Sequence, residues 1–286
     1  MKTIHGSLLK RVAVLLFIAA FGTRAFADEV NSTNAGLMLH GGVGAGSAIF
    51  GFVQDTDSSS ALGSGRSTGF DLGMLLNYQF LAVGLGFTRV SFDTLEWDEE
   101  INGTEYTIES KGSGYFYTFD ATLGLKLFIE PGDMGFTHFF FGFRGWKAFR
   151  DQKSVSSDPP FAVGDEIDPG KYEMSGSGWI AGFRDFSTLP LGIFSLALQS
   201  GLWIYNAPLR DLKVLGVEVE PREEQSIGFG AELGIGLAFE EIGLSILGGL
   251  KMDITATGFS TTTVSDVVAG AGYAQFFLVL KKEFAL

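Results

Sequence analysis

The sequence contains no cysteine, and only seven of its 286 residues are proline. Without cysteine the chain has neither disulfide bonds nor thiolate metal sites. Basic residues are also scarce, since 20 lysines and arginines stand against 33 aspartates and glutamates, for a formal net charge of −13. This excess of acid argues against nucleic acid as a partner, because the phosphate backbone is bound by basic surfaces.

Long hydrophobic runs are absent as well, because no segment reaches the roughly 18 consecutive apolar residues that a membrane-spanning helix requires. Near the N-terminus, Lys10 and Arg11 precede a short apolar run at 12–21 and the small-x-small sequence Ala25-Phe26-Ala27. This pattern predicts a secretory signal peptide over residues 1–27, with an uncleaved N-terminal anchor as the alternative. The mature chain, residues 28–286, would carry 16 basic and 33 acidic residues, and export would deliver it to the periplasm or the outer membrane.

Glycine and phenylalanine, by contrast, are abundant, with 40 and 28 residues. Apolar residues and glycine alternate most regularly over residues 226–255, where apolar positions from Ile227 to Phe239 are separated mostly by glycine. After Glu240 and Glu241 the alternation resumes and continues to Thr255. A period of two predicts β-strands, and these would be about twice the usual 5–6 residues. Long strands with one apolar face and one small or polar face are typical of membrane barrels, whose apolar face points outward.

The same alternation recurs along the chain, and the connections are short and long in turn. Tight turns are expected near residues 78, 132, 190 and 240, and longer loops near 60, 102, 160, 215 and 260. We therefore predict an all-β fold, one transmembrane antiparallel up-and-down β-barrel of about ten strands over residues 28–286. Eight or twelve strands are also compatible with the pattern, because each strand gives a weak signal. A bulge is expected near residues 89–92, where the alternation blurs.

Alternate residues of the last strand share one face: Phe276, Leu278, Leu280, Lys282, Phe284 and Leu286. This strand resembles the C-terminal assembly signal of bacterial outer-membrane proteins, although here the aromatic residue stands two places before the final Leu286. The resemblance is to the superfamily and covers the mature chain. It implies a multi-pass protein of the bacterial outer membrane, with outer-membrane lipid, lipopolysaccharide and the barrel-assembly machinery as partners.

Several ionisable residues fall on the predicted inner face of the barrel. Two interpretations compete, an ion-paired network that fills the lumen and the lining of a small polar pore. We favour the network, because buried charges need partners and a ten-stranded barrel is little wider than one filled by its own side chains. Lys251 and Asp253 are expected to belong to one cluster. The predicted inward set is His40, Asp71, Asp120, Lys126, His138, Arg144, Arg184, Glu232, Lys251 and Asp253.

Catalytic signatures are weak. Ten strands also resemble the omptin proteases, whose site includes an Asp-x-His element at the extracellular rim, but no Asp-x-His occurs here. A lipid A deacylase would need adjoining His and Ser on the outer-leaflet surface, whereas His138 adjoins Thr137 near the expected periplasmic end. The segment from Asp55 begins like a calcium loop, yet Ser60 stands where glycine is required. We therefore expect no catalytic activity, no metal ion and no cofactor.

The acidic run from Glu96 to Glu109 allows two interpretations, a solvated face, which we favour, or a site for divalent cations at the lipopolysaccharide surface. For the whole chain we expect either a narrow, porin-like passive channel for small solutes or a structural envelope protein. The alternative is an adhesin whose extracellular loops bind a host or matrix ligand.

Overall fold

The computed structural model describes residues 35–54, 60–101, 104–127, 136–160, 170–214, 217–220, 222–260 and 267–285. The predicted signal peptide and Leu286 lie outside these residues and stay predictions. In this part of the chain nearly every residue belongs to a strand. The elements are β1 (Ala35–Gln54), β2 (Ser60–Tyr78), β3 (Leu81–Ile101), β4 (Thr104–Leu127), β5 (Phe136–Asp158), β6 (Gly170–Pro190), β7 (Ser195–Asn206), β8 (Leu209–Val214), β9 (Val217–Val219), β10 (Arg222–Phe239), the 3-10 helix η1 (Glu240–Ile242), β11 (Leu244–Ser260) and β12 (Val267–Ala285).

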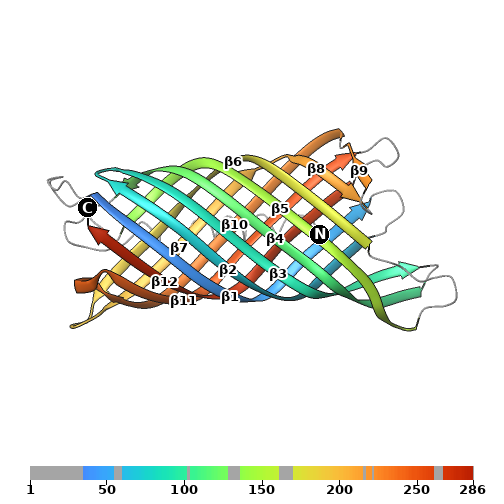
Figure 1. The fold of residues 1–286 in the computed structure, drawn as a ribbon, viewed down its shortest axis with the longest axis horizontal. Coiled ribbons are helices and arrows are strands. Elements are labelled where there is room, and N and C mark those ends of the chain that lie inside the picture. The colour runs from blue at the N-terminus through green and yellow to red at the C-terminus, as the bar shows by residue number, and fades with distance from the viewer. Residues whose placement is uncertain are drawn as a thin grey trace, which may run out of the picture.

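Ten of these strands form a closed antiparallel ring (Figure 1). Each long strand pairs with the next along the chain, β7 pairs with β10, and β12 closes the ring on β1. Strands β8 and β9 stand outside the count, because β8 continues the pairing of β7 along β6 and β9 forms a hairpin with β8. The predicted fold class and the predicted ten strands are confirmed.

The alternation of the sequence separates the two faces of the wall. Outward side chains are apolar and exposed, as for Leu233 at 65 % and Phe276 at 72 %. Inward side chains are buried, as for Phe50 and Trp203 at 1 % each. An apolar exterior around a closed hydrogen-bond ladder is the arrangement that a bilayer requires, because no backbone polar group is left unpaired in hydrocarbon.

Tight connections lie at one end of the barrel, together with the C-terminus (Figure 1). They comprise the turn at 79–80, the bend at 192–194 and the helix η1, which ends at Gly243 with a φ of 59°. A left-handed residue at a helix C-terminus favours glycine, which has no Cβ to clash. Three of the four expected tight turns are thus observed, and the one near residue 132 lies outside the described residues. By the usual asymmetry of such barrels, this end faces the periplasm.

At the opposite end the strands are longer, and the loops shorter, than the sequence predicted. The loop expected from Asp151 to Lys171 is shortened, because β5 continues to Asp158 and β6 begins at Gly170. The loop expected from Ala207 to Glu224 contains β8 and β9. Outside the bilayer a strand needs no apolar face to maintain its hydrogen-bond ladder, so the loss of alternation marked the edge of the membrane and not the end of the strand.

The barrel is therefore much taller than a membrane. The 23 residues of β5 span about 75 Å along the strand, or roughly 55–60 Å along the axis of a tilted barrel. An outer-membrane apolar band is about 25 Å tall. More than half of β5 consequently stands outside the hydrocarbon.

The register shifts within five of the strand pairings, β2–β3, β3–β4, β4–β5, β6–β8 and β10–β11. The shift between β3 and β4 lies between Phe92 and Thr94, next to the region where a bulge was expected. A separate break in the wall lies at Ala207 and Pro208, between β7 and β8, where proline cannot donate to the ladder. There the carbonyl of Ala207 accepts hydrogen bonds from the Trp146 indole at 2.9 Å and the Ser226 hydroxyl at 3.1 Å.

None of the helical residues among those described forms a segment long and apolar enough to cross a membrane.

Candidate functional site in the barrel lumen

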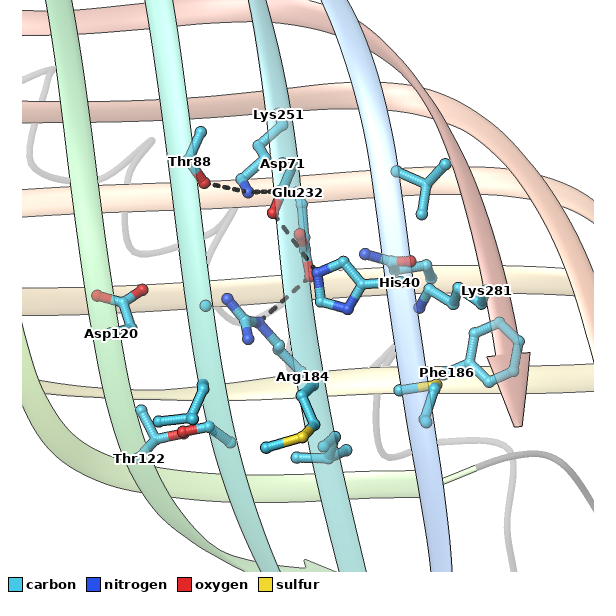
Figure 2. Close-up of a pocket in the computed structure, with 18 of the residues that line it drawn as sticks. His40, Asp71, Thr88, Asp120, Thr122, Arg184, Phe186, Glu232, Lys251 and Lys281 are labelled. Carbon is cyan, nitrogen blue, oxygen red and sulfur yellow. Dashed lines mark hydrogen bonds and ion pairs between the residues drawn. The ribbon is translucent and has the colours of Figure 1, made fainter. Parts of the chain in front are cut away.

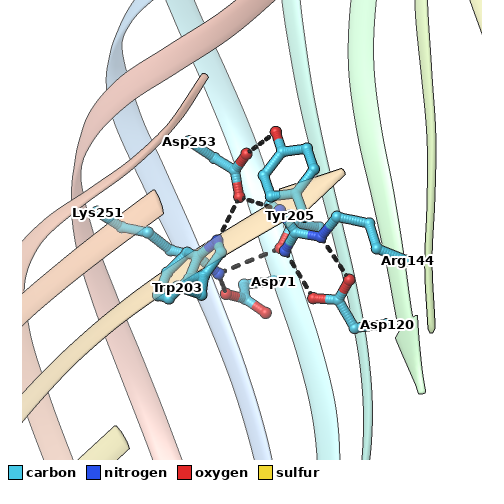
Figure 3. A network of polar contacts seen from close by, with 8 residues as sticks. Asp71, Asp120, Arg144, Trp203, Tyr205, Lys251 and Asp253 are labelled. Atoms are coloured by element: carbon cyan, nitrogen blue, oxygen red, sulfur yellow. Dashed lines mark hydrogen bonds and ion pairs between the residues drawn. The ribbon is translucent and has the colours of Figure 1, made fainter. Parts of the chain in front are cut away.

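The lumen contains three ion-paired groups at its middle and an apolar cluster toward the extracellular end. The most buried group centres on Arg144 of β5, whose side chain is 2 % exposed (Figure 3). Its guanidinium binds both carboxylate oxygens of Asp120 on the neighbouring strand, with Nε–Oδ1 at 2.6 Å and Nη2–Oδ2 at 2.7 Å. Its third nitrogen, Nη1, donates across the lumen to Asp253 of β11 at 2.6 Å. One arginine thus connects opposite walls of the barrel.

Asp253 is fully buried and accepts two further hydrogen bonds from β7. The Trp203 indole donates to Oδ2 at 2.9 Å, and the Tyr205 hydroxyl donates to Oδ1 at 2.6 Å (Figure 3). The Arg144 guanidinium also lies over the Tyr205 ring, 4.4 Å from its centroid. A buried carboxylate is tolerated only when its oxygens are satisfied, and here three donors satisfy them.

Two lumen-facing glycines of β10 make this geometry feasible. Trp203 and Asp253 lie on either side of Gly230 in the ladder, and the indole reaches the carboxylate by crossing that glycine. A Cβ at Gly230 would meet the indole nitrogen at 2.0 Å, and one at Gly228 would meet the Tyr205 ring at 1.9 Å. The Tyr205 and Trp203 rings therefore pack directly on the glycine-rich inner face of β10.

The second group contains Lys251 of β11, which pairs with Asp71 of β2 and also donates to the Thr88 hydroxyl at 3.2 Å. Asp71 is shared with His40, whose Nε2 lies 3.5 Å from Oδ1 (Figure 2). In the third group, Arg184 Nε lies 3.4 Å from Glu232 Oε1.

A cavity of about 70 Å³ is lined by residues of all three groups, among them His40, Asp120 and Glu232 (Figure 2). A water needs roughly 10–15 Å³ of such space, so the cavity suits about five waters. Its lining includes His138, Gln199 and Lys281, and the Lys281 ammonium lies 4.4 Å from the centroid of the Phe186 ring. Below it, a small apolar cluster narrows the lumen: Met38, Leu75, Ala82, Phe186, Ala197, Ala238 and Leu247.

Toward the extracellular end, the lumen is filled by a much larger apolar cluster, here called the aromatic plug. The Phe116 ring stacks on Trp146 with centroids 6.5 Å apart and contacts Tyr273 at 6.0 Å. Arg150 crosses this region, 3 % exposed, with its guanidinium 4.2 Å from the Trp97 ring centroid. The larger members of the plug are Phe50, Phe92, Leu95, Trp97, Tyr106, Ile108, Phe116, Phe140, Trp146, Met174, Ile180, Trp203, Tyr205, Leu209, Leu212, Phe259 and Tyr273.

The structure places all ten residues of the predicted inward set in the lumen. Lys251 and Asp253, expected in one cluster, bind different partners in adjacent groups. Lys126 stands opposite His138 in the β4–β5 ladder, and its ammonium is attracted electrostatically by the Glu283 carboxylate. Of the predicted assembly signal, the described side chains are outward and exposed: Phe276, Leu278, Leu280 and Phe284.

Sequence reasoning missed several lumen residues. Lys281 and Glu283 were missed because the last strand was analysed only for its apolar face, although they alternate with that face. Arg150 of β5 was also missed. The packing of Trp203 and Trp146 in a plug was not predicted either. A tryptophan on the inner face, next to a strand rich in glycine, was the sequence signal that could have predicted the plug.

Among the described residues, no group of three or more His, Asp or Glu side chains is arranged to hold a metal ion. Two acidic residues of the β3–β4 hairpin accept hydrogen bonds from hydroxyls, Asp98 from Thr107 at 2.8 Å and Glu109 from Ser156 at 3.2 Å.

Comparison with known proteins gives no match to a family model or to a curated protein. Solved structures do match. The outer-membrane protease OmpT from Escherichia coli is similar with a TM-score of 0.56 and 10 % identity, over 90 % of this chain and 99 % of OmpT. The transport unit of the autotransporter AIDA-I from Escherichia coli has a TM-score of 0.42 and 11 % identity, over 96 % of this chain and 97 % of that one. The toluene transporter TodX of P. putida has a TM-score of 0.30 and 8 % identity, over 88 % and 90 %.

At these identities the likeness concerns the fold. It agrees with the closed ten-stranded ring, the apolar outer wall and the polar lumen, all of which suit a bilayer. The chain is a closed ten-stranded β-barrel with an apolar outer wall, a fold that it shares with OmpT.

Proposed function

We propose that this protein is a structural envelope barrel with a closed lumen and no enzymatic activity. The observation that carries the proposal is the aromatic plug, which lies above a layer in which Arg144 joins opposite walls. A solute would have to displace tightly packed rings and separate buried ion pairs, both of which are costly. Such a lumen supports the barrel wall and leaves the extracellular ends of the strands to meet other molecules.

The histidines support the non-enzymatic part of the proposal. His40 and His138, the two in the mature chain, line the lumen cavity below the plug. A protease or deacylase of the kinds considered above would need histidine at the extracellular rim or on the lipid-facing wall. The name of OmpT therefore supplies no activity for this chain.

Planar-bilayer recording of the refolded mature protein tests the closed lumen. We expect no single-channel steps from the wild type, and steps from a variant whose plug is emptied by Phe116→Ala, Trp146→Ala and Tyr273→Ala. The matched control removes three exposed outward rings of the same types by Phe119→Ala, Trp179→Ala and Tyr78→Ala, and should stay silent. Each protein must first show heat-dependent gel mobility, which reports a folded barrel. Steady steps from the wild type would refute the proposal.

A further inference from the structure

The outer wall carries a cluster of basic and aromatic side chains over four adjacent strands, β3 to β6, and β8. We call it the cationic cluster: Arg89, Lys147, Lys171 and Lys213, with Tyr115, Phe149 and Glu173. All of these side chains point outward, away from the lumen. The four long strands lie side by side (Figure 1), so the cluster is one continuous surface.

The contacts within the cluster leave it with more cations than anions. Glu173 is the one carboxylate, and two lysines share it, Lys147 Nζ at 2.6 Å and Lys213 Nζ at 3.9 Å. Arg89 and Lys171 lie over rings instead, with the guanidinium 5.1 Å from the centroid of Tyr115 and the ammonium 5.7 Å from that of Phe149. Neither has a carboxylate within ion-pair distance in the part of the chain that the structure describes.

Three further carboxylates lie nearby. Asp93 of β3 is exposed, and Asp151 stands opposite Lys171 in the ladder without forming an ion pair. Asp211 accepts a hydrogen bond from Ser175 at 2.8 Å. The two rings of the cluster stack on each other with centroids 5.1 Å apart, which fixes the platform beneath Arg89 and Lys171. The cluster therefore has ordered rings and only partly neutralised cations.

The position of the cluster identifies its environment. Lys147 stands four residues beyond Phe143 on β5, about 13 Å along the strand. Phe143, Phe119 and Trp179 belong to the exposed apolar wall directly below. The opposite wall differs, because the described outward side chains in the extracellular halves of β11, β12 and β1 include no ionisable group. A chain with a strong excess of acid thus concentrates cations where its lipid-facing wall leaves the hydrocarbon.

We propose that the cationic cluster binds the phosphate groups of a phosphorylated glycolipid of the outer leaflet, whose acyl chains lie along Phe119, Phe143 and Trp179. Arginine and lysine form short charge-assisted hydrogen bonds with phosphate oxygens, and an apolar wall below them suits acyl chains. A soluble macromolecule fits less well, because the surface continues into the membrane. The inference rests on the outer-membrane location and not on the proposed closed lumen.

Retention of lipopolysaccharide by the refolded full-length mature protein tests the proposal. The protein is mixed with lipopolysaccharide in detergent, washed on a column and assayed for bound lipid by mass spectrometry. The test variant is Arg89→Gln/Lys147→Gln/Lys213→Gln. The control is Lys282→Gln, which removes an outward lysine that lies 5.2 Å from the Phe284 ring centroid near the periplasmic end. Heat-dependent gel mobility verifies folding of each protein.

We expect the wild type and Lys282→Gln to retain lipopolysaccharide, and the triple variant to lose affinity by about tenfold or more as three charge-assisted contacts disappear. Glu173→Gln should increase retention, because it frees two lysines; this variant keeps the test decisive if the triple variant fails to fold. Equal retention by the wild type, the triple variant and Glu173→Gln would overturn the proposal. So would equal retention of phosphatidylglycerol, or full competition by millimolar inorganic phosphate, since either would show a site for any anion.

Discussion

Arg144 binds two carboxylates that lie far apart in the sequence and on opposite walls of the barrel. The pairing with Asp120 is local to one ladder, but the bond to Asp253 exists only because the ring closes. With one guanidinium satisfying two buried acids, removal of the arginine leaves both acids without their cation. Loss of Arg144 should therefore destabilise the group more than loss of either Asp120 or Asp253.

Arg144→Gln should lower the free energy of unfolding by roughly 3–5 kcal/mol, as expected when one partner of a buried ion pair is removed. Lys111→Gln is the matched control, since it breaks an exposed pair with Glu109 and should cost no more than about 1 kcal/mol. Urea unfolding of both variants in lipid vesicles, followed by tryptophan fluorescence, measures the difference. Equal costs would show that the lumen pair is hydrated and weak.

At this scale the sequence predicted which face a side chain occupies but not which residues meet. Alternation identifies the inner face because the period of a strand is two. It carries no information about the stagger between strands, which decides that Lys251 reaches Asp71 while Asp253 reaches Arg144. The partners could not be predicted without the closed ring.

At the scale of elements, the break between β7 and β8 is a place where side chains in the lumen stabilise the backbone of the wall. Pro208 removes a ladder donor, and the buried carbonyl of Ala207 accepts hydrogen bonds from Trp146 and Ser226 of other strands instead. The apolar plug thus also supplies polar support for a kink in the wall.

Trp146→Phe and Ser226→Ala should each loosen β8, because each removes one donor to the Ala207 carbonyl, worth about 1 kcal/mol. Hydrogen exchange of the amides at 209–214 is the measurement, and we expect faster exchange there in both variants. The amides of β11 serve as an internal reference that should change little. Unaltered exchange in β8 would mean that the kink is held by its own backbone.

The elements themselves were predictable within the membrane and less so beyond it. Alternation with glycine located the spanning part of each strand, as in β10 and β11. Beyond the bilayer the strands continue with polar residues, as in β5 up to Asp158, and no periodic signal marks them. The ends of the strands could therefore be located only from their pairing with neighbouring strands.

For the whole molecule, the connections of an up-and-down antiparallel barrel alternate between its two ends, and the described tight turns share one end with the C-terminus. The mature sequence has no cysteine, so a single introduced thiol reports its own side of the membrane. Val155 near the end of β5 and Ile193 in the bend before β7 are both exposed, at 52 % and 93 %.

Val155→Cys should react with a bulky, membrane-impermeant maleimide on intact cells, whereas Ile193→Cys should react only after the outer membrane is permeabilised. Labelling followed by gel mobility shift measures both, and the cysteine-free parent protein gives the background. The reverse pattern would invert the assigned orientation of the barrel.

The packing of Trp203 across Gly230 constrains how the sequence can diverge in evolution. A methyl group at 230 would collide with the indole, and a small residue at 203 would deprive Asp253 of a donor. Neither position can drift alone, so diverging lineages must keep the pair or exchange both members together. The lipid-facing wall has no such coupling, because many apolar side chains serve there. The interior should therefore preserve ancestry after the exterior has lost it.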